Sequence, residues 1–434
     1  MILSLGIDIG TSGVKTATLN SEGDVISNSS IKHELQNLDN INPSVWWKTV
    51  KKAIKLNLID LYSKGINSSK IKKIAVDGTS GTVLLANENL QPVTRALMYN
   101  ATGFVKEAKI IEKYSPENHI AKGQNSTLAR ALRLIKEDKN RNAKYLMHQA
   151  DFIVANLLKK GGLSDENNTL KLGYDLKKND WPEWIHRTGL KKNLLPKVYP
   201  VGAHLGKLNE VIANELGLNK KTNIYAGTTD GNAGFLASSK FQIGSAVTSL
   251  GSTLTVKVLS EIQIEDSNIG LYSHKLGKYW LVGGASNTGG NVLEKHFSKN
   301  QIINLSKEIN PNNSSGLEYY PLANIGERFP ENNPERKPKL IPRPNDETLF
   351  LHGLLEGMAK IEKKSYEAIH QLGGSFPDHI ITVGGGSKNL VWEKIRMRII
   401  KTKISSGKNV EAAVGTAKIP VSYTHLTLPT IYSV

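Results

Sequence analysis

The sequence predicts an α/β protein with two related domains. The chain has 434 residues, which exceeds what one hydrophobic core usually organises. Short apolar runs typical of buried strands end in glycine-rich loops, and amphipathic helical patterns follow them. The same pattern of strand, Gly-Ser/Thr turn and strand occurs at residues 3–20 and again at residues 246–258. This repetition indicates that each half of the chain begins a similar domain.

The composition excludes several kinds of site and partner. No cysteine is present, so disulfides, thiolate metal sites and cysteine nucleophiles are excluded. The formal net charge of +17 would suit a nucleic-acid ligand, but the lysines are scattered in pairs without interleaved aromatic residues. We therefore expect no nucleic-acid partner, although a basic surface still attracts an anionic nucleotide.

The N-terminal sequence carries no targeting pattern. It runs from Met1 directly into a strand pattern, with no basic segment followed by an apolar one. No later run approaches the length of a membrane span. These features predict a cytoplasmic protein without a membrane partner, and no pattern predicts an oligomeric state.

The first hairpin, residues 3–20, turns at Gly10-Thr11-Ser12-Gly13. Its glycines permit close backbone approach and positive φ, and the hydroxyl groups of Thr11 and Ser12 can donate hydrogen bonds to a phosphate. Asp8 stands in the apolar strand 5–9, where an unpaired buried charge is costly. An ordinary hairpin is the alternative interpretation of the turn, but Asp8 favours a ligand site.

A second acidic loop follows the apolar strand 71–76. It reads Asp77-Gly78-Thr79-Ser80-Gly81-Thr82. Ligands collect at the carboxyl ends of strands in open α/β sheets, so Asp77 and Ser80 are candidate site residues. A plain turn is the alternative.

The segment Gly227-Thr228-Thr229-Asp230-Gly231-Asn232-Ala233-Gly234 places one carboxylate among glycines, after an apolar run and before a helical pattern. Such a turn directs backbone N–H groups outward toward an anion, and an aspartate in it can accept a proton or hold a metal. The alternative is that Asp230 only caps the helix. Its position at the junction of the two halves favours catalysis, and the two roles do not exclude each other.

The second half contains further glycine-rich loops. The hairpin 246–258 turns at Gly251-Ser252-Thr253, a small-residue loop around Gly289 follows another strand, and the strand 380–383 ends in Gly384-Gly385-Gly386. Two hairpin loops that face each other across a cleft could hold one polyphosphate. The triple glycine lacks the spacing of the dinucleotide fingerprint and is a weak signal alone. Trp392, at the start of the next helix, could stack on a purine or belong to the core.

Taken in order, these motifs resemble those of the FGGY carbohydrate kinase family over residues 3–419. The resemblance implies an α/β, two-domain actin-like ATPase (ribonuclease H-like) fold with a cleft between the domains. Residues 1–226 would form the N-terminal domain with the sugar site and the first phosphate loop, and residues 227–420 the ATP-binding C-terminal domain. Residues 421–434 break the helical pattern of residues 412–419 and are predicted to be a non-native tail.

The family's motifs also imply the roles of individual residues. Asp230 would be the catalytic base and would contact the sugar together with Asp8 and Ser80, and Asp77 is a further sugar-binding candidate from its loop. Asp8 would also hold Mg²⁺ or orient the sugar. The residues expected to contact ATP are Thr11, Ser12, Gly251, Ser252, Thr253, Gly289, Gly384, Gly385, Asn389 and Trp392, the last two at the adenine.

Four segments, at 76–80, 249–254, 280–287 and 326–330, resemble the short pentulose kinases of cyanobacteria and plants that act on D-ribulose. The resemblance implies that ATP, with Mg²⁺, phosphorylates a ketopentose, with D-ribulose converted to D-ribulose 5-phosphate. The alternatives are a kinase for D-xylulose, glycerol or another polyol, an actin- or chaperone-like ATPase that acts through partners, and an inactive remnant. The family's Asn-Asp-x-Arg pattern is replaced by Asn100-Ala101-Thr102-Gly103, so a sugar contact is expected to be missing.

Overall fold

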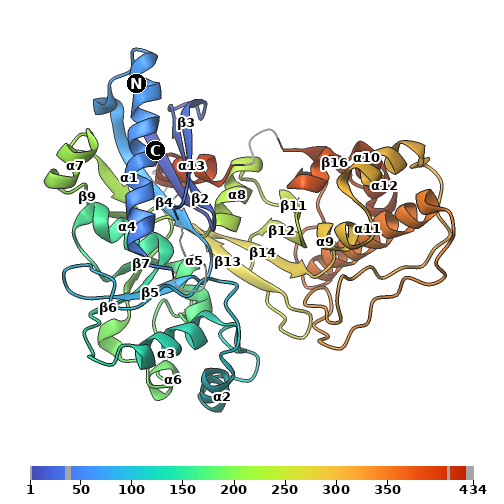
Figure 1. The fold of residues 1–434 in the computed structure, drawn as a ribbon, viewed down its shortest axis with the longest axis horizontal. Helices are drawn as coiled ribbons and strands as arrows, with labels where there is room; N and C mark the ends of the chain where they lie inside the picture. Colours follow the sequence, from blue (N-terminus) through green and yellow to red (C-terminus); the bar gives the residue numbers. More distant parts are fainter. Residues whose placement is uncertain (1, 35–40, 408–410, 427–434) are drawn as a thin grey trace, which may run out of the picture. The chain divides into compact units, whose positions relative to one another are not determined.

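The computed structural model describes residues 2–34, 41–407 and 411–426, which form two compact units (Figure 1). The first unit takes residues up to 237, residues 275–278 and those from 411 onward, and the second takes residues 238–274 and 279–410. Each unit contains a six-stranded mixed sheet with helices against it, as the predicted α/β class requires. The predicted domain limits, at 226 and 420, stay a prediction, because compact units are defined by contacts and not by independent folding.

The sheet of the first unit has the strand order β3-β2-β1-β4-β10-β9. Its central strand, β1, pairs antiparallel with β2 and parallel with β4, so the predicted hairpin forms. Apolar and β-branched residues dominate the inner strands, which are buried on both faces. The strands are β1 (Leu3–Ile9), β2 (Gly13–Leu19), β3 (Val25–Lys32), β4 (Ile71–Gly78), β9 (His204–Lys207) and β10 (Asn223–Tyr225).

Helices that pack on this sheet come from both ends of the chain. Helix α1 (Ser44–Ser63) follows Pro43, whose fixed φ suits a helix start, and buries Trp46, Val50 and Ile54. Helices α4 (Gln149–Leu158) and α7 (Glu210–Leu216) share the apolar core of α1. Helices α8 (Asp230–Ser238) and α13 (Ala412–Leu426) form a separate apolar cluster with β2.

Helix α13 lies so close to β1 that only glycine fits at position 6. A Cβ atom at Gly6 would stand 2.0 Å from the carbonyl oxygen of Ala413. The helix continues through Leu426 and contains Pro420, so the helical pattern does not end at residue 419 as predicted. The non-native origin of residues 421–434 stays a prediction, and residues 427–434 lie outside the described part of the chain.

The part of the chain that connects β4 to β9 in the sequence has its own apolar cluster. It is built around two short pairs of strands, β5 with β6 and β7 with β8. Its elements are β5 (Val83–Ala86), α2 (Val105–Tyr114), α3 (Thr127–Glu137), β6 (Tyr145–His148), β7 (Leu163–Asp165), α5 (Glu166–Thr169), α6 (Trp184–Arg187) and β8 (Lys197–Tyr199), with short 3-10 turns at Leu170–Leu172 and Lys192–Leu194. A further 3-10 turn, Ser68–Lys70, lies between α1 and β4.

The second unit repeats the central pairing of the first. Its sheet has the order β13-β14-β12-β11-β15-β16, and β11 pairs antiparallel with β12 and parallel with β15, as β1 does with β2 and β4. The strands are β11 (Ala246–Leu250), β12 (Leu254–Ser260), β13 (Tyr272–Leu276), β14 (Tyr279–Ser286), β15 (His379–Val383) and β16 (Lys403–Ser406). The helices are α9 (Gly290–His296), α10 (Lys299–Glu308), α11 (Glu347–Gln371) and α12 (Leu390–Ile400), with a 3-10 turn at Gly385–Lys388.

No helix within the described residues is long and apolar enough to cross a membrane.

A buried ion pair holds the core of the second unit together. Arg396 of α12 donates from Nε and Nη2 to the two carboxylate oxygens of Glu362 on α11, at 2.6 and 2.7 Å. Arg396 Nη1 also donates to Thr382 of β15 at 2.8 Å, and Thr248 of β11 donates to Glu362 at 2.5 Å. Both charged side chains are at most 1% exposed. The network therefore joins two helices to the two strands that precede the Gly251 and Gly384 loops.

The buried segment 165–168 supports the loop before α8. Asn167 donates from Nδ2 to the hydroxyl of Thr228 at 2.9 Å, and Asn168 donates to the Thr228 carbonyl at 3.3 Å. Burial raises the pKa of Asp165 to about 6 and that of Glu166 to about 7. The carboxyl group of Glu166 accepts one hydrogen bond from the backbone N–H of Val201 at 3.2 Å.

Replacing Arg396 by Met should lower the free energy of unfolding by about 3 to 5 kcal/mol, because it leaves the Glu362 carboxylate buried without its cation. Lys364→Met breaks the exposed 3.5 Å pair with Glu331 and should cost less than about 1 kcal/mol. Urea unfolding of both variants measures the difference. Equal losses would contradict the assigned importance of the buried pair.

The raised pKa of Glu166 predicts a pH-dependent stability. A carboxyl group whose folded pKa is above its unfolded value of 4.5 contributes stability that is complete below that value and is lost as the pH rises through about 7. Relative to the native chain, Glu166→Gln should therefore gain about 2 kcal/mol of stability between pH 5 and pH 8. Chemical denaturation at both values tests this, and a difference independent of pH would refute it.

Candidate active site

Two aspartates lie side by side where β1 and β4 end. Asp8 and Asp77 are paired residues in the parallel register of these strands. Burial, together with the nearby negative charge of Asp230, raises the pKa of Asp8 to about 6. Burial raises the pKa of Asp77 well above its ordinary value, and the charge of Asp8 acts in the same direction. The pair therefore tends to hold one proton between its carboxyl groups.

Asp77 has no exposed surface, whereas Asp8 is partly exposed. One carboxyl oxygen of Asp77 accepts a hydrogen bond from the hydroxyl of Thr416 on α13. Its other oxygen, Oδ1, has no conventional partner within the described residues, which fits a protonated carboxyl group that donates to Asp8. Sugar binding by Asp77 stays a prediction, and its burial means that it would act on a ligand through Asp8.

Asp230 begins helix α8, directly after the residue that pairs with the end of β4. Its Oδ1 accepts a hydrogen bond from the backbone N–H of Gly231 at 2.6 Å, so it contacts the backbone at the start of the helix. Thr229 forms a parallel bridge with Gly78, and a Cβ atom at Gly227 would stand 1.8 Å from the Val76 carbonyl oxygen. These contacts bring Asp230 close enough to Asp8 and Asp77 for its charge to raise the pKa of both.

The loop Gly78–Thr82 carries the partly exposed Ser80 beside the acidic group. Behind it, the side-chain oxygen of Gln149 accepts from the backbone N–H and the hydroxyl of Thr79, at 3.0 and 2.7 Å. Gln149 is fully buried, and its Nε2 has no partner within the residues that the structure describes. Gln149 was not among the predicted site residues, although a buried glutamine that opens a largely apolar helical run was a usable signal.

Arg130 of α3 fixes the same loop from another side. Its guanidinium donates to the carbonyl of Gly81 at 3.2 Å and to those of Tyr99 and Ala101, the latter at 3.3 Å. The side chain is 2% exposed, and burial lowers its pKa to about 10. Arg130 thus reaches the segment in which the Asn-Asp-x-Arg pattern is missing. An arginine among buried apolar positions of an amphipathic helix was the signal in the sequence.

The turn between β1 and β2 leaves both of its hydroxyl residues, Thr11 and Ser12, exposed. The backbone N–H of Gly10 donates to the carbonyl of Gly13 at 2.9 Å, and that of His33 donates to the carbonyl of Ser12 at 2.9 Å. The hydroxyl groups are therefore presented on a hydrogen-bonded turn, as a phosphate ligand would require.

The predicted loops of the second unit come together. Gly290 donates from its N–H to the carbonyl of Gly251 at 2.8 Å, and a Cβ atom at Gly289 would stand 2.7 Å from Thr253. Gly384 has φ +87°, and a Cβ atom there would stand 2.6 Å from the carbonyl oxygen of Leu250. Gly251, Ser252, Thr253, Gly289 and Gly384 thus form one group of close backbone approaches, and Gly385 begins the 3-10 turn that follows.

Asn389 and Trp392 lie at the start of α12. Asn389 Oδ1 accepts from the backbone N–H of Trp392 at 3.0 Å, and its Nδ2 donates to the hydroxyl of Ser306 on α10 at 2.9 Å. Trp392 is 2% exposed and belongs to the core, where a Cβ atom at Gly386 would stand 2.7 Å from its ring. Contact of Trp392 with an adenine stays a prediction. The burial of Trp392 favours a role in supporting Gly386 from the core.

Within the described residues, no group of three or more histidine, aspartate or glutamate side chains could hold a metal ion. Mg²⁺ in phosphoryl-transfer sites usually takes one or two protein carboxylates and completes its shell with phosphate oxygens and water. The partly exposed Asp8 fits this requirement as a single ligand, and its role as a metal ligand stays a prediction.

The sequence matches the two domain models of one family. The N-terminal domain of the FGGY family of carbohydrate kinases matches residues 3–237, and its C-terminal domain matches residues 246–419. A xylulose kinase of Staphylococcus xylosus is 23% identical, with the match covering 94% of this chain and 87% of that protein.

Solved structures agree in fold. A xyloylose kinase from Brucella ovis superposes with a TM-score of 0.86 at 19% identity, covering 99% of this chain and 93% of that chain. A xylulose kinase from Rhodospirillum rubrum gives 0.85 at 18% identity, covering 98% and 91%. The predicted two-domain α/β fold and the predicted family are therefore confirmed. The chain belongs to the FGGY family of carbohydrate kinases and is an ATP-dependent sugar kinase.

Proposed function

We propose that this kinase transfers the terminal phosphoryl group of ATP to the terminal hydroxyl of a ketopentose, with D-ribulose as the preferred substrate. D-Ribulose follows from the resemblance of four sequence segments to the short D-ribulose kinases. D-Xylulose is the second candidate, because the curated relative from Staphylococcus xylosus and its homologue from Bacillus subtilis are both xylulose kinases.

The observation that carries the proposal is the group of three carboxylates Asp8, Asp77 and Asp230 beside the Ser80 loop. Asp230 stands at the N-terminus of α8, where the helix dipole favours the ionised form. An ionised carboxylate can accept the proton of the attacking hydroxyl late in phosphoryl transfer, when the oxygen has become acidic. Asp8 and Ser80 would orient the sugar, and Asp77 would share its proton with Asp8.

The phosphate and metal contacts follow from the loops. In the first unit, Thr11 and Ser12 are the proposed phosphate contacts. In the second unit, they are Gly251, Ser252, Thr253 and Gly289, with Gly384, Gly385, Asn389 and Trp392 proposed at the adenosine. Asp8 would hold Mg²⁺, which would supply charge neutralisation on the phosphates.

Asp230→Asn separates catalysis from helix capping, because the amide oxygen still accepts a hydrogen bond from Gly231. We expect kcat to fall by about 10²- to 10⁴-fold while ADP binding persists, since one general base contributes about that much. Asp346→Asn is the control, because Asp346 caps α11 by accepting from the backbone N–H groups of Thr348 and Leu349, and its replacement should leave activity unchanged. Substantial turnover by Asp230→Asn would refute the assignment of the base.

A coupled ATP-consumption assay tests the substrate. The panel comprises D-ribulose, D-xylulose, a hexulose and glycerol, with chains that end at residue 420 and at residue 434. We expect D-ribulose to give the highest kcat/KM. A higher value for D-xylulose or glycerol would refute the D-ribulose assignment, and ATP consumption independent of any sugar would instead favour an ATPase that acts through partners.

A further inference from the structure

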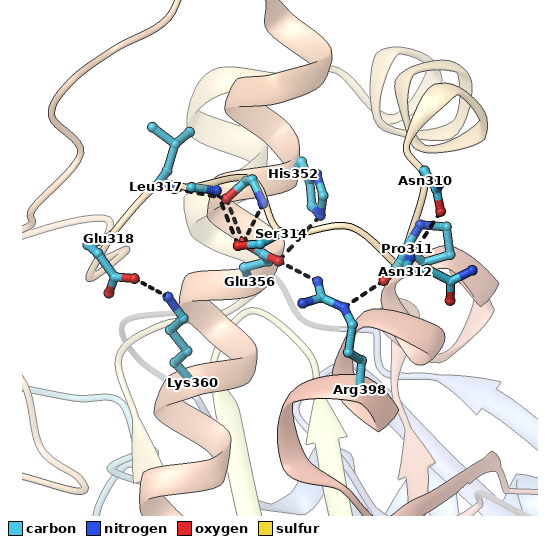
Figure 2. A network of polar contacts seen from close by, with 12 residues as sticks. Asn310, Pro311, Asn312, Ser314, Leu317, Glu318, His352, Glu356, Lys360 and Arg398 are labelled. Atoms are coloured by element: carbon cyan, nitrogen blue, oxygen red, sulfur yellow. Dashed lines mark hydrogen bonds and ion pairs between the residues drawn. The ribbon is translucent and has the colours of Figure 1, made fainter.

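A buried carboxylate in the second unit accepts hydrogen bonds from two other segments of the chain (Figure 2). Glu356 of α11 is 1% exposed. Its Oε2 accepts from the backbone N–H and the hydroxyl of Ser315, at 3.0 and 2.5 Å, and its Oε1 accepts from Nη2 of Arg398 on α12. His352, one turn earlier on α11, lies 3.5 Å from Oε1. Burial alone raises the pKa of Glu356, but these donors outweigh it and keep the pKa well below the usual range.

Glu356 thereby fixes a segment that has little regular structure of its own. The connection 309–346 between α10 and α11 contains only isolated bridges and a few backbone hydrogen bonds, so side-chain contacts contribute to holding its backbone. Arg398, which Glu356 holds, also donates from Nε to the carbonyl of Pro311 at 2.7 Å. Pro311 lies three residues after the end of α10. The Glu356–Arg398 pair therefore anchors the C-terminal end of α10 to α12.

The other end of α12 contacts the same helix. Asn389, at the N-cap of α12, donates from Nδ2 to the hydroxyl of Ser306, two residues before α10 ends. Asn389 also accepts from the backbone N–H of Trp392, so both ends of its amide are engaged. The orientation of the Asn389 side chain thus depends on where Ser306 stands, and the position of Ser306 depends on the anchored end of α10.

We propose that Glu356 is a positioning residue for the nucleotide, which acts by holding Asn389 in its adenosine-binding orientation through α10. This inference rests on the proposed contact between Asn389 and adenosine. Loss of the carboxylate removes the shared acceptor of Ser315 and Arg398, and it frees the connection and the end of α10. Asn389 must then be ordered when the nucleotide binds, which weakens affinity without removing any group that touches the ligand.

Isothermal titration of ADP into Glu356→Gln measures this effect in the full chain. We expect the Kd for ADP to rise about tenfold, because Gln keeps the size but not the charge, while the KM for the sugar changes by less than about twofold. Lys360→Met is the matched control on the same helix. It breaks the exposed 2.7 Å pair between Lys360 and Glu318, also visible in Figure 2, and should leave the Kd unchanged.

A double-mutant cycle distinguishes an effect that passes through Asn389 from a general loss of structure in the second unit. In an Asn389→Ala background, Glu356→Gln should change the Kd for ADP by less than about twofold, because the residue through which it acts is gone. Ser306→Ala removes the hydrogen bond from Asn389 to the hydroxyl of Ser306, which is the last contact between Glu356 and Asn389 in this series. This variant should weaken ADP binding even if Glu356→Gln fails to fold.

The outcomes distinguish this inference from the proposed function. Native protein that binds no ADP would overturn the proposed function. Native protein that binds ADP, with Glu356→Gln binding equally well, would overturn the positioning role alone. An equal loss in the native and Asn389→Ala backgrounds would also overturn it, because the effect would then not pass through Asn389.

Discussion

The parallel pairing of β1 with β4 is the constraint on which the candidate site depends. It places Asp8 directly beside Asp77 at the carboxyl end of the sheet, where burial raises the pKa of both carboxyl groups. Two adjacent buried carboxylates cannot both ionise cheaply, so the pair tends to keep one proton. Helix α13 completes the arrangement, because Thr416 donates to Asp77 and Gly6 admits the helix against β1. The loop of Asp230 is then fixed beside this pair.

The sequence predicted the parts of the site that are local. Asp8 stands within an apolar strand, Asp77 directly follows one, and Asp230 lies in a glycine-rich turn, and these patterns are readable without the fold. The residues that it missed act across long separations. Thr416 is 339 positions from Asp77, and Gln149 is 70 positions from Thr79. Arg130 and Asn167 are similar cases, because a buried polar side chain reveals its partner only once the chain has folded.

Each unit fixes its loops with buried polar networks rather than with the loops' own structure. In the first unit, Asn167, Asn168 and Gln149 hold Thr228 and Thr79 by hydrogen bonds. In the second, the Glu362–Arg396 pair joins the strands that precede the glycine loops, and Glu356 fixes the irregular connection after α10. Such networks are costly when incomplete and rigid when satisfied. Phosphoryl transfer depends mainly on positioning, so rigid loops are the feature that a kinase requires.

In the proposed reaction, the phosphoryl group of ATP passes to a ketopentose and not to water. Phosphorus-31 NMR of the protein with Mg²⁺, ATP and D-ribulose tests it directly. The proposed mechanism predicts a sugar phosphomonoester signal that grows in step with ADP, and that grows at least about a hundredfold more slowly with Asp230→Asn. The appearance of ADP together with inorganic phosphate alone would contradict it.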